Sequence, residues 1–256
     1  MVVGRGRSKV MDSTANSVWP QPPLSDGEIH FLWSFMDGSI MNPETRWRLR
    51  YGWGMCQRHA FGWVSMEATF RPSILMGPVI LYEDIMERAV QAFRARGPGQ
   101  GLRVAWGLRE RGPCLMCELD YGPDSKAAAA DERALKHGRE LQNIRSFALA
   151  TEPWWQPAVC GVCAGSDSPA LCRGHLREAL LRGGAVDLER QRTLAESILR
   201  HLSSFSRGLT WDYRGTDTVE DRAALVSAIG WCGGWQPWLW LMAGSGSNKD
   251  TGGILP

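Results

Sequence analysis

Apolar residues recur along this chain with the three-to-four-residue spacing of amphipathic helices. After Ser25, the residues Phe31, Leu32, Phe35 and Met36 fall on one side of a predicted helix. The same spacing covers residues 43–50, 59–70, 72–93, 126–150, 172–183, 187–205 and 218–229. Alternation with a period of two, which is typical of strands, is nearly absent. We therefore predict an all-α protein, a helical bundle.

Short signals mark the ends of several predicted helices. Ser25 and Glu28 have the spacing of a capping box, and Pro43 suits the first position of a helix. The alanine run at 127–130 favours helix, and the prolines at 153 and 157 should end that helix. The glycine-rich segment 97–101 predicts a flexible connector. It is not a phosphate loop, because no strand precedes it and the Walker lysine is missing.

These signals divide the chain into two helical units of related plan. We predict a disordered lead at 1–24, a first helical unit at 25–96, a connector at 97–113, a second helical unit at 114–230 and a Trp/Gly-rich tail at 231–256. With 256 residues, the chain is long enough to bury a substantial core in one large or two small domains.

Candidate chemistry lies in four short Cys/His pairs, each with two residues between its members. These are Cys56/His59, Cys114/Cys117, Cys160/Cys163 and Cys172/His175. Together they use six of the seven cysteines and supply two complete Cys₃His sets. Zn²⁺ prefers four tetrahedral nitrogen or sulfur ligands, and a two-residue gap lets one turn present two of them to the same ion. We therefore predict two structural zinc ions.

Several stretches resemble an uncharacterised bacterial family of helical proteins. "GMCQRHAFGWVSME" followed by "ILYEDIMERA" is similar to its first repeat, with a central LYED helix. "CLMCELD", "LCRGHL" and "WDYRGTDTVEDRAALVSAIG" fit its second CPxC…CRxH repeat and its C-terminal helix. The chain departs from the pattern twice, because no CxxC precedes Cys56 and the extra pair Cys160/Cys163 lies inside the second repeat. The resemblance implies a paired zinc-binding helical fold and no defined reaction.

Which CxxC joins which CxxH stays open at this point. The family-like arrangement joins Cys114/Cys117 with Cys172/His175. The local arrangement instead joins Cys160/Cys163 with Cys172/His175, and leaves Cys114/Cys117 for Cys56/His59. Loop closure favours the local arrangement, although its entropic cost grows slowly with loop length.

Charge and cysteine usage limit the classes of function. The basic start of the chain lacks the apolar stretch of a secretory signal, so we expect a cytoplasmic protein. In a reducing compartment, paired cysteines favour metal binding or redox chemistry over disulfides. A zinc ion with four protein ligands has no position for a substrate water, so we favour a binding or scaffolding module over an enzyme. The alternative is a thiol-based redox or metal-responsive protein that uses Cys160 and Cys163.

A second group of polar residues is a weaker candidate site. Tyr82, Glu83 and Asp84 lie together in the LYED stretch, and Tyr213 and Arg214 could form a polar lock with them. We favour buried tyrosine and solvated acids over an acid–base pair, because adjacent carboxylates on a helix face different ways.

The tryptophans and the charge balance bear on partners. We expect Trp33, Trp47, Trp53 and Trp63 to line the core of the first unit. Glycine and proline interrupt the Trp-rich tail, so we favour docking on the core or on a protein partner over membrane contact. Arg46, Arg48, Arg50 and Arg58 form a local basic group. A net charge of +2 disfavours nucleic acid as a partner.

Overall fold

The structure is a computed structural model that describes residues 23–70, 75–127 and 131–243. These residues form helices and connecting segments, and none of them is in a strand, which confirms the predicted all-α class. The α-helices are α1 (Asp26–Met36), α2 (Pro43–Gly52), α3 (Gln57–Phe70), α4 (Met76–Ala92), α5 (Gln100–Gly107), α6 (Leu115–Glu118), α7 (Glu132–His137), α8 (Gln142–Trp155), α9 (Gly161–Ala164), α10 (Arg173–Leu181), α11 (Leu188–Gly208), α12 (Val219–Gly233) and α13 (Gln236–Ala243). Three short 3₁₀ helices, η1 (Ser39–Met41), η2 (Gln156–Ala158) and η3 (Trp211–Tyr213), join them.

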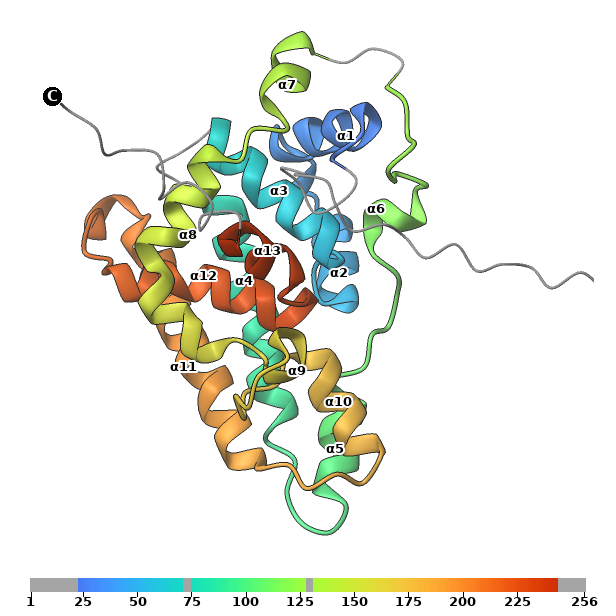
Figure 1. Ribbon diagram of the computed structural model, residues 1–256, viewed down its shortest axis with the longest axis vertical. Coiled ribbons are helices and arrows are strands. Elements are labelled where there is room, and N and C mark those ends of the chain that lie inside the picture. The colour runs from blue at the N-terminus through green and yellow to red at the C-terminus, as the bar shows by residue number, and fades with distance from the viewer. Residues whose placement is uncertain (1–22, 71–74, 128–130, 244–256) are drawn as a thin grey trace, which may run out of the picture.

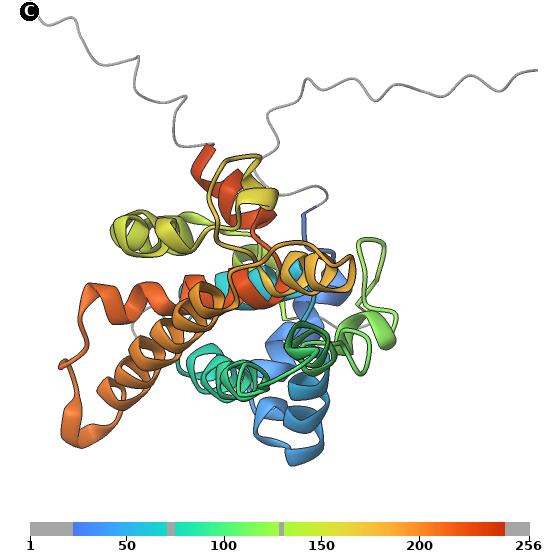
Figure 2. The same cartoon turned by 90° about the horizontal axis from the view of Figure 1, so that it is seen from below.

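The helix α12 lies at the centre of the fold (Figure 1). Every residue from Ala223 to Cys232 is buried, which is the pattern of a helix surrounded by protein on all sides. It packs against α3, α4, α8, α10 and α11. Seen from below, α4 and α8 lie on opposite sides of the layer that α11 and α12 form (Figure 2).

Two helices of the described chain, α1 and α12, begin with a capping box in which both reciprocal hydrogen bonds form. Ser25 caps α1 together with Glu28, as the sequence predicts, and Thr218 caps α12 together with Asp221. Asp221 also accepts a hydrogen bond from His201 of α11, with Nδ1 and Oδ1 2.8 Å apart. The start of α12 is therefore fixed both by its own residues and by its longest neighbour.

Tryptophan rings fill much of the core. Among the described residues, six tryptophans are fully buried: Trp53, Trp63, Trp155, Trp231, Trp235 and Trp238. The last three belong to the Trp-rich tail, so its described part, residues 231–243, docks on the core. Trp235 stacks on Trp155 with ring centroids 5.9 Å apart, and Trp238 meets Phe61 edge-on at 5.3 Å. In the described residues, no helix has both the length and the apolar content needed to cross a membrane.

One of the tryptophans predicted for the core lies elsewhere. Trp33 is half-buried and packs against the core, whereas Trp47 is 56% exposed. Trp47 lies on the outer face of α2, where its ring contacts Tyr51 instead of a core residue.

Arginines hold the C-terminal ends of three helices around Trp53. Arg88 covers the Trp53 ring at 3.9 Å and donates hydrogen bonds to the last carbonyls of α2. Arg173 donates to the carbonyl of Leu108, the residue after α5, and to the carbonyl of Cys232, in the last turn of α12. Burial and the nearby Arg111 and Arg173 lower the pKa of Arg88 to about 10, which keeps it charged at neutral pH. Helix C-termini carry partial negative charge, so these cations stabilise the junction.

The structure corrects the predicted course of two segments. The predicted helix at 126–150 is two helices, α7 and α8, because α7 ends at Gly138, which packs closely against Ile29. The predicted end of the second helix within 153–157 is confirmed, because α8 ends at Trp155 with Pro153 in its last turn. Trp155 is buried, and its Nε1 donates to the carbonyl of Ala148. The predicted connector at 97–113 contains the helix α5, which packs against α10. Packing against α10 thus allows a helix where the glycines of the connector predicted none.

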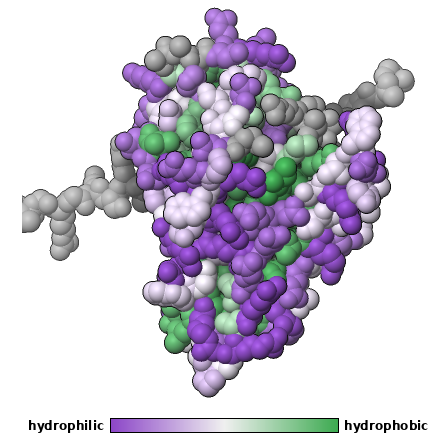
Figure 3. Space-filling model, turned by 180° about the vertical axis from the view of Figure 1, so that it is seen from behind, coloured by the Kyte–Doolittle hydropathy of each residue, from purple (hydrophilic) through white to green (hydrophobic). Residues whose placement is uncertain are grey.

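Parts of the predicted plan fall outside the described residues. These are almost all of the predicted lead, at 1–22, the final segment of the tail, at 244–256, Pro72, and residues 128–130 of the alanine run. Within the described chain, buried residues from both predicted helical units belong to one hydrophobic cluster. The face seen from behind is mostly hydrophilic, with bands of hydrophobic side chains between the hydrophilic ones (Figure 3).

Replacing Gly230 by alanine should destabilise the fold. A Cβ at this position would lie 2.6 Å from the buried ring of Trp235, so either the ring or α12 must move. We expect a loss of about 1–3 kcal/mol in the free energy of unfolding, measured by urea denaturation. The matched control is Gly174→Ala in α10, where an added Cβ meets no atom within 4 Å. That variant should be neutral or more stable by up to about 1 kcal/mol. Equal effects of the two substitutions would contradict this packing.

Candidate metal centres

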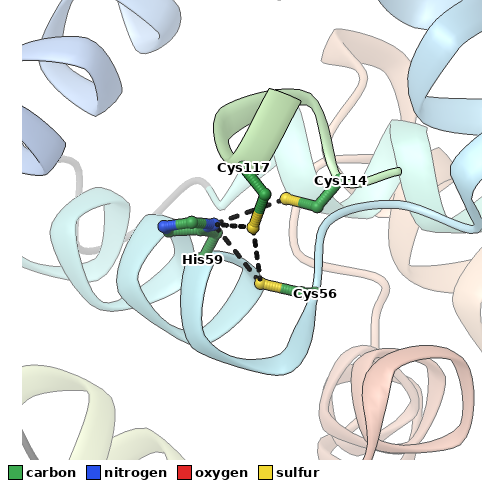
Figure 4. A group of neighbouring side chains, drawn as sticks. All are labelled: Cys56, His59, Cys114 and Cys117. Carbon is green, nitrogen blue, oxygen red and sulfur yellow. Dashed lines mark hydrogen bonds between the residues drawn. The ribbon is translucent and has the colours of Figure 1, made fainter. Parts of the chain in front are cut away.

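The eight predicted ligands gather into two groups of four. Cys56 and His59 join Cys114 and Cys117 in the first centre (Figure 4). The second centre consists of Cys160, Cys163, Cys172 and His175. Within each group, all ligand atoms lie within 4.8 Å of one another. The structure therefore has the local pairing, and the family-like pairing of Cys114/Cys117 with Cys172/His175 is wrong.

Both centres are built from helix N-termini in the same way. In each, a CxxC starts a four-residue helix, α6 or α9, and its first cysteine is the N-cap residue. In each, a CxxH opens a longer helix, α3 or α10, with the cysteine just before the first turn and the histidine inside it. Helix N-termini present unpaired N–H groups and partial positive charge, which favour thiolate over thiol.

The chain turns sharply before the first centre so that Cys56 can meet α6. Trp53 and Gly54 both have positive φ, at 63° and 88°. A Cβ at Gly54 would also lie 2.8 Å from the Tyr82 hydroxyl, so glycine is the residue that fits both the turn and the close approach.

In the first centre, the imidazole nitrogen faces all three sulfurs. His59 Nδ1 lies 3.3 Å from Cys56 Sγ, 3.4 Å from Cys114 Sγ and 3.5 Å from Cys117 Sγ. Cys56 and Cys117 sulfurs are 3.9 Å apart. A tetrahedral Zn²⁺ with ordinary bond lengths places its ligand atoms roughly 3.5–3.8 Å apart. The donor set and its spacing therefore fit a zinc ion.

The second centre repeats this geometry. His175 Nδ1 lies 3.3 Å from Cys160 Sγ, 3.5 Å from Cys163 Sγ and 3.2 Å from Cys172 Sγ. Cys163 and Cys172 sulfurs are 3.9 Å apart, and no sulfur is in a disulfide. The CxxC loop is braced by Gln236 of α13, whose Nε2 donates to the carbonyl of Cys163 at 2.9 Å.

One thiol in each centre is strongly acidic. Hydrogen bonds from Cys56 and His59 lower the pKa of Cys114 to about 3, against the opposing effect of burial. Hydrogen bonds from Cys163 and Cys172 likewise lower the pKa of Cys160. The pKa values of Cys56 and Cys172 are raised, since each donates its proton to that thiolate. A divalent ion bound at either group would displace the thiol protons that remain.

A buried carboxylate supports the first centre, and sequence reasoning assigned it only a capping role. Glu28 is fully buried, and its Oε1 lies 3.0 Å from His59 Nε2. Arg58 donates to both carboxylate oxygens at 2.7 Å, and the Ser25 N–H donates to Oε2. These bonds outweigh burial and lower the pKa of Glu28 to about 2. A carboxylate on the far nitrogen of a ligating histidine fixes its tautomer and orientation.

Glu28 is not a ligand itself, because it contacts His59 Nε2 while the three sulfurs face Nδ1. In the described chain, the second centre has no such carboxylate, and no acidic side chain lies within hydrogen-bond distance of His175. The second centre instead borders an open cleft of about 850 Å³ between α10 and the end of α12.

The second predicted polar cluster does not form. Tyr82 is fully buried, whereas Tyr213 is 50% exposed and lies beneath Arg207. Asp84 pairs with Arg50, with Nε and Oδ1 3.3 Å apart. Among the described residues, no ion pair or hydrogen bond joins Arg214 to Glu83 or Asp84. The predicted lock is absent because Arg50 of α2 is the basic group that reaches Asp84 on α4.

Comparison with protein-family models, curated proteins and solved structures finds no match to this chain. The resemblance to the bacterial helical family therefore stays a prediction.

Replacing Glu28 by glutamine should weaken metal binding at the first centre alone. The amide removes the negative charge that orients His59, and we expect a roughly 10–100-fold loss of affinity there. Competition with a chelator removes the two ions in turn, so one titration measures the metal affinity of both centres in the same sample. The second centre is the internal control.

The matched control variant is Glu178→Gln, which changes an exposed acid that pairs with Arg182. It should leave both affinities unchanged. An unchanged first centre in Glu28→Gln, or equal weakening of both centres, would contradict the supporting role of Glu28.

Proposed function

We propose that this protein is a zinc-stabilised helical module that binds or scaffolds a partner, with two structural ions and no chemistry of its own. The observation that carries this proposal is the closure of both centres. Each offers four protein ligands, three sulfurs and one nitrogen, which complete the tetrahedral set of Zn²⁺. A closed site has no position at which a substrate or a reactive water could bind.

The chain needs such ions for its shape. The helices α6 and α9 have only four residues each, and helices this short are not stable by themselves. When bound, structural zinc contributes folding free energy on the order of 10 kcal/mol in small zinc modules. The ligands of the first centre would fix α6 to α3, and those of the second centre would fix α9 to α10.

The ligand chemistry favours zinc over other metals. Thiolate and imidazole together suit Zn²⁺, whereas iron–sulfur clusters are usually held by four cysteines. Free paired thiols also fit a reducing compartment, so we place the protein in the cytoplasm.

A thiol-redox function would use the same residues, so thiol reactivity separates the two functions. As a structural zinc protein, the purified chain should carry two zinc ions, and its six ligand thiols should react slowly with an alkylating reagent. Chelation with denaturation should then expose all seven cysteines. A reversible loss of two thiols at a defined potential, with the protein still folded, would contradict the structural function.

Removing one ligand should remove one ion. We expect Cys117→Ser to bind a single zinc ion, measured by native mass spectrometry, because a hydroxyl is a poor replacement for thiolate. The control is Cys232→Ala, which changes the one cysteine outside both centres. It should keep two ions. Two firmly held ions in Cys117→Ser would show that this cysteine is not a ligand.

A further inference from the structure

One face of the molecule combines exposed aromatic rings with arginine side chains. It consists of Trp47 and Tyr51 on α2, Trp106 on α5, and Arg109 and Arg111 in the segment that follows α5. We call it the arginine–aromatic surface. Trp47 is 56% exposed and Trp106 is 67% exposed. Neither ring takes part in the core.

The planar groups of this surface contact one another in two sets. The Trp47 and Tyr51 rings lie 3.9 Å apart between centroids, and the Arg111 guanidinium lies 5.3 Å from the Tyr51 centroid. The Arg109 guanidinium lies 3.8 Å from the Trp106 centroid. The backbone joins the two sets, because the Arg111 N–H donates to the carbonyl of Tyr51 at 3.2 Å.

The positive charge of this region is poorly compensated. Residues 88–111 contain six arginines and one acid, and α2 contains three arginines and one acid. Arg48 pairs with Glu118, and Arg50 pairs with Asp84. The only acid of the segment 88–111, Glu110, pairs with Arg173. In the described chain, Arg109 and Arg111 have no ion-pair partner, and neither has Arg46 or Arg103.

The first metal centre would hold this surface in place. Cys114 follows Arg111 by three residues, and the intervening Pro113 packs closely against Gly52 at the end of α2. An ion bound by Cys56 and Cys114 would therefore fix the segment 109–111 against α2.

We propose that the arginine–aromatic surface binds single-stranded RNA; this inference rests on the proposed function and names the partner of the module. Unpaired bases stack on exposed aromatic rings and on guanidinium planes, and unpaired arginines bind phosphates. Bases in a duplex are covered by their neighbours and cannot stack in this way. RNA is the nucleic acid whose recognition chiefly uses unpaired bases in loops and single strands. The total charge of +2 would disfavour nucleic acid if the positive charge were spread evenly over the protein. Here the positive charge is concentrated in α2 and residues 88–111.

Fluorescence anisotropy on the full, zinc-loaded chain tests this proposal. The probes are a labelled single-stranded RNA of about 20 nucleotides, the DNA strand of the same sequence, and the RNA duplex, at about 50 mM salt. We expect saturable binding that is tightest for single-stranded RNA. The triple variant Trp106→Ala/Arg109→Gln/Arg111→Gln should bind it at least about tenfold more weakly. The slope of log affinity against log salt should shrink by about 1.4 for two lost phosphate contacts.

The matched control is Trp211→Ala/Arg190→Gln/Arg214→Gln. It removes one exposed tryptophan, 85% accessible, and two exposed arginines from other parts of the surface. Its affinity for RNA should stay within about twofold of the parent.

Several results would overturn the proposal. These are no saturable binding by folded protein that carries two ions, equal loss in the control variant, or tighter binding of the DNA strand or the duplex. Tighter binding of an acidic polyglutamate peptide, lost in the same triple variant, would instead assign the surface to an acidic protein partner. Metal content is measured on the same samples. RNA binding by folded protein without bound metal would contradict the structural zinc function and leave the surface assignment standing.

Discussion

Each metal centre brings three cysteine sulfurs and an imidazole nitrogen within 4.8 Å of one another. Three thiolates at this spacing repel one another strongly in a partly buried site. A divalent cation removes that repulsion and takes up the four ligand atoms at their observed separations. This requirement fixes where α6 meets α3 and where α9 meets α10, because the ligands lie at the first turns of these four helices.

The two centres share a plan but differ in what they join. The second closes a short stretch of chain, from Cys160 to His175, and orders α9 against α10. The first spans a much longer stretch, from Cys56 to Cys117, and attaches α6 to α3. Only the first has a buried carboxylate behind its histidine, and that carboxylate, Glu28, also caps α1 and holds Arg58. The first centre is therefore tied to the start of the fold, whereas the second depends on α13 through Gln236.

The ligand set and the helical class could be predicted from the sequence because they depend on local spacing. Two-residue gaps place paired ligands on one turn, and three-to-four-residue periodicity marks helices wherever one side is buried. The role of Glu28 could not be predicted in this way, since it depends on where α1 meets α3. The helix α5 could not be predicted because glycine is typical of loops. Here Gly101 and Gly107 instead allow α5 to pack closely against Leu180 and Ala92. The exposure of Trp47 and its contact with Tyr51 depend on which face of α2 meets the core, and the many tryptophans gave no guide to that.

Hydrogen exchange with and without the ions tests the central claim most directly. The account predicts that chelation of both ions removes amide protection from α6, α9 and the first turns of α3 and α10. Protection in the central helix α12 should fall less, because its burial does not depend on a single ligand. A metal-free chain in which α6 and α9 keep the protection of the loaded protein would contradict the account.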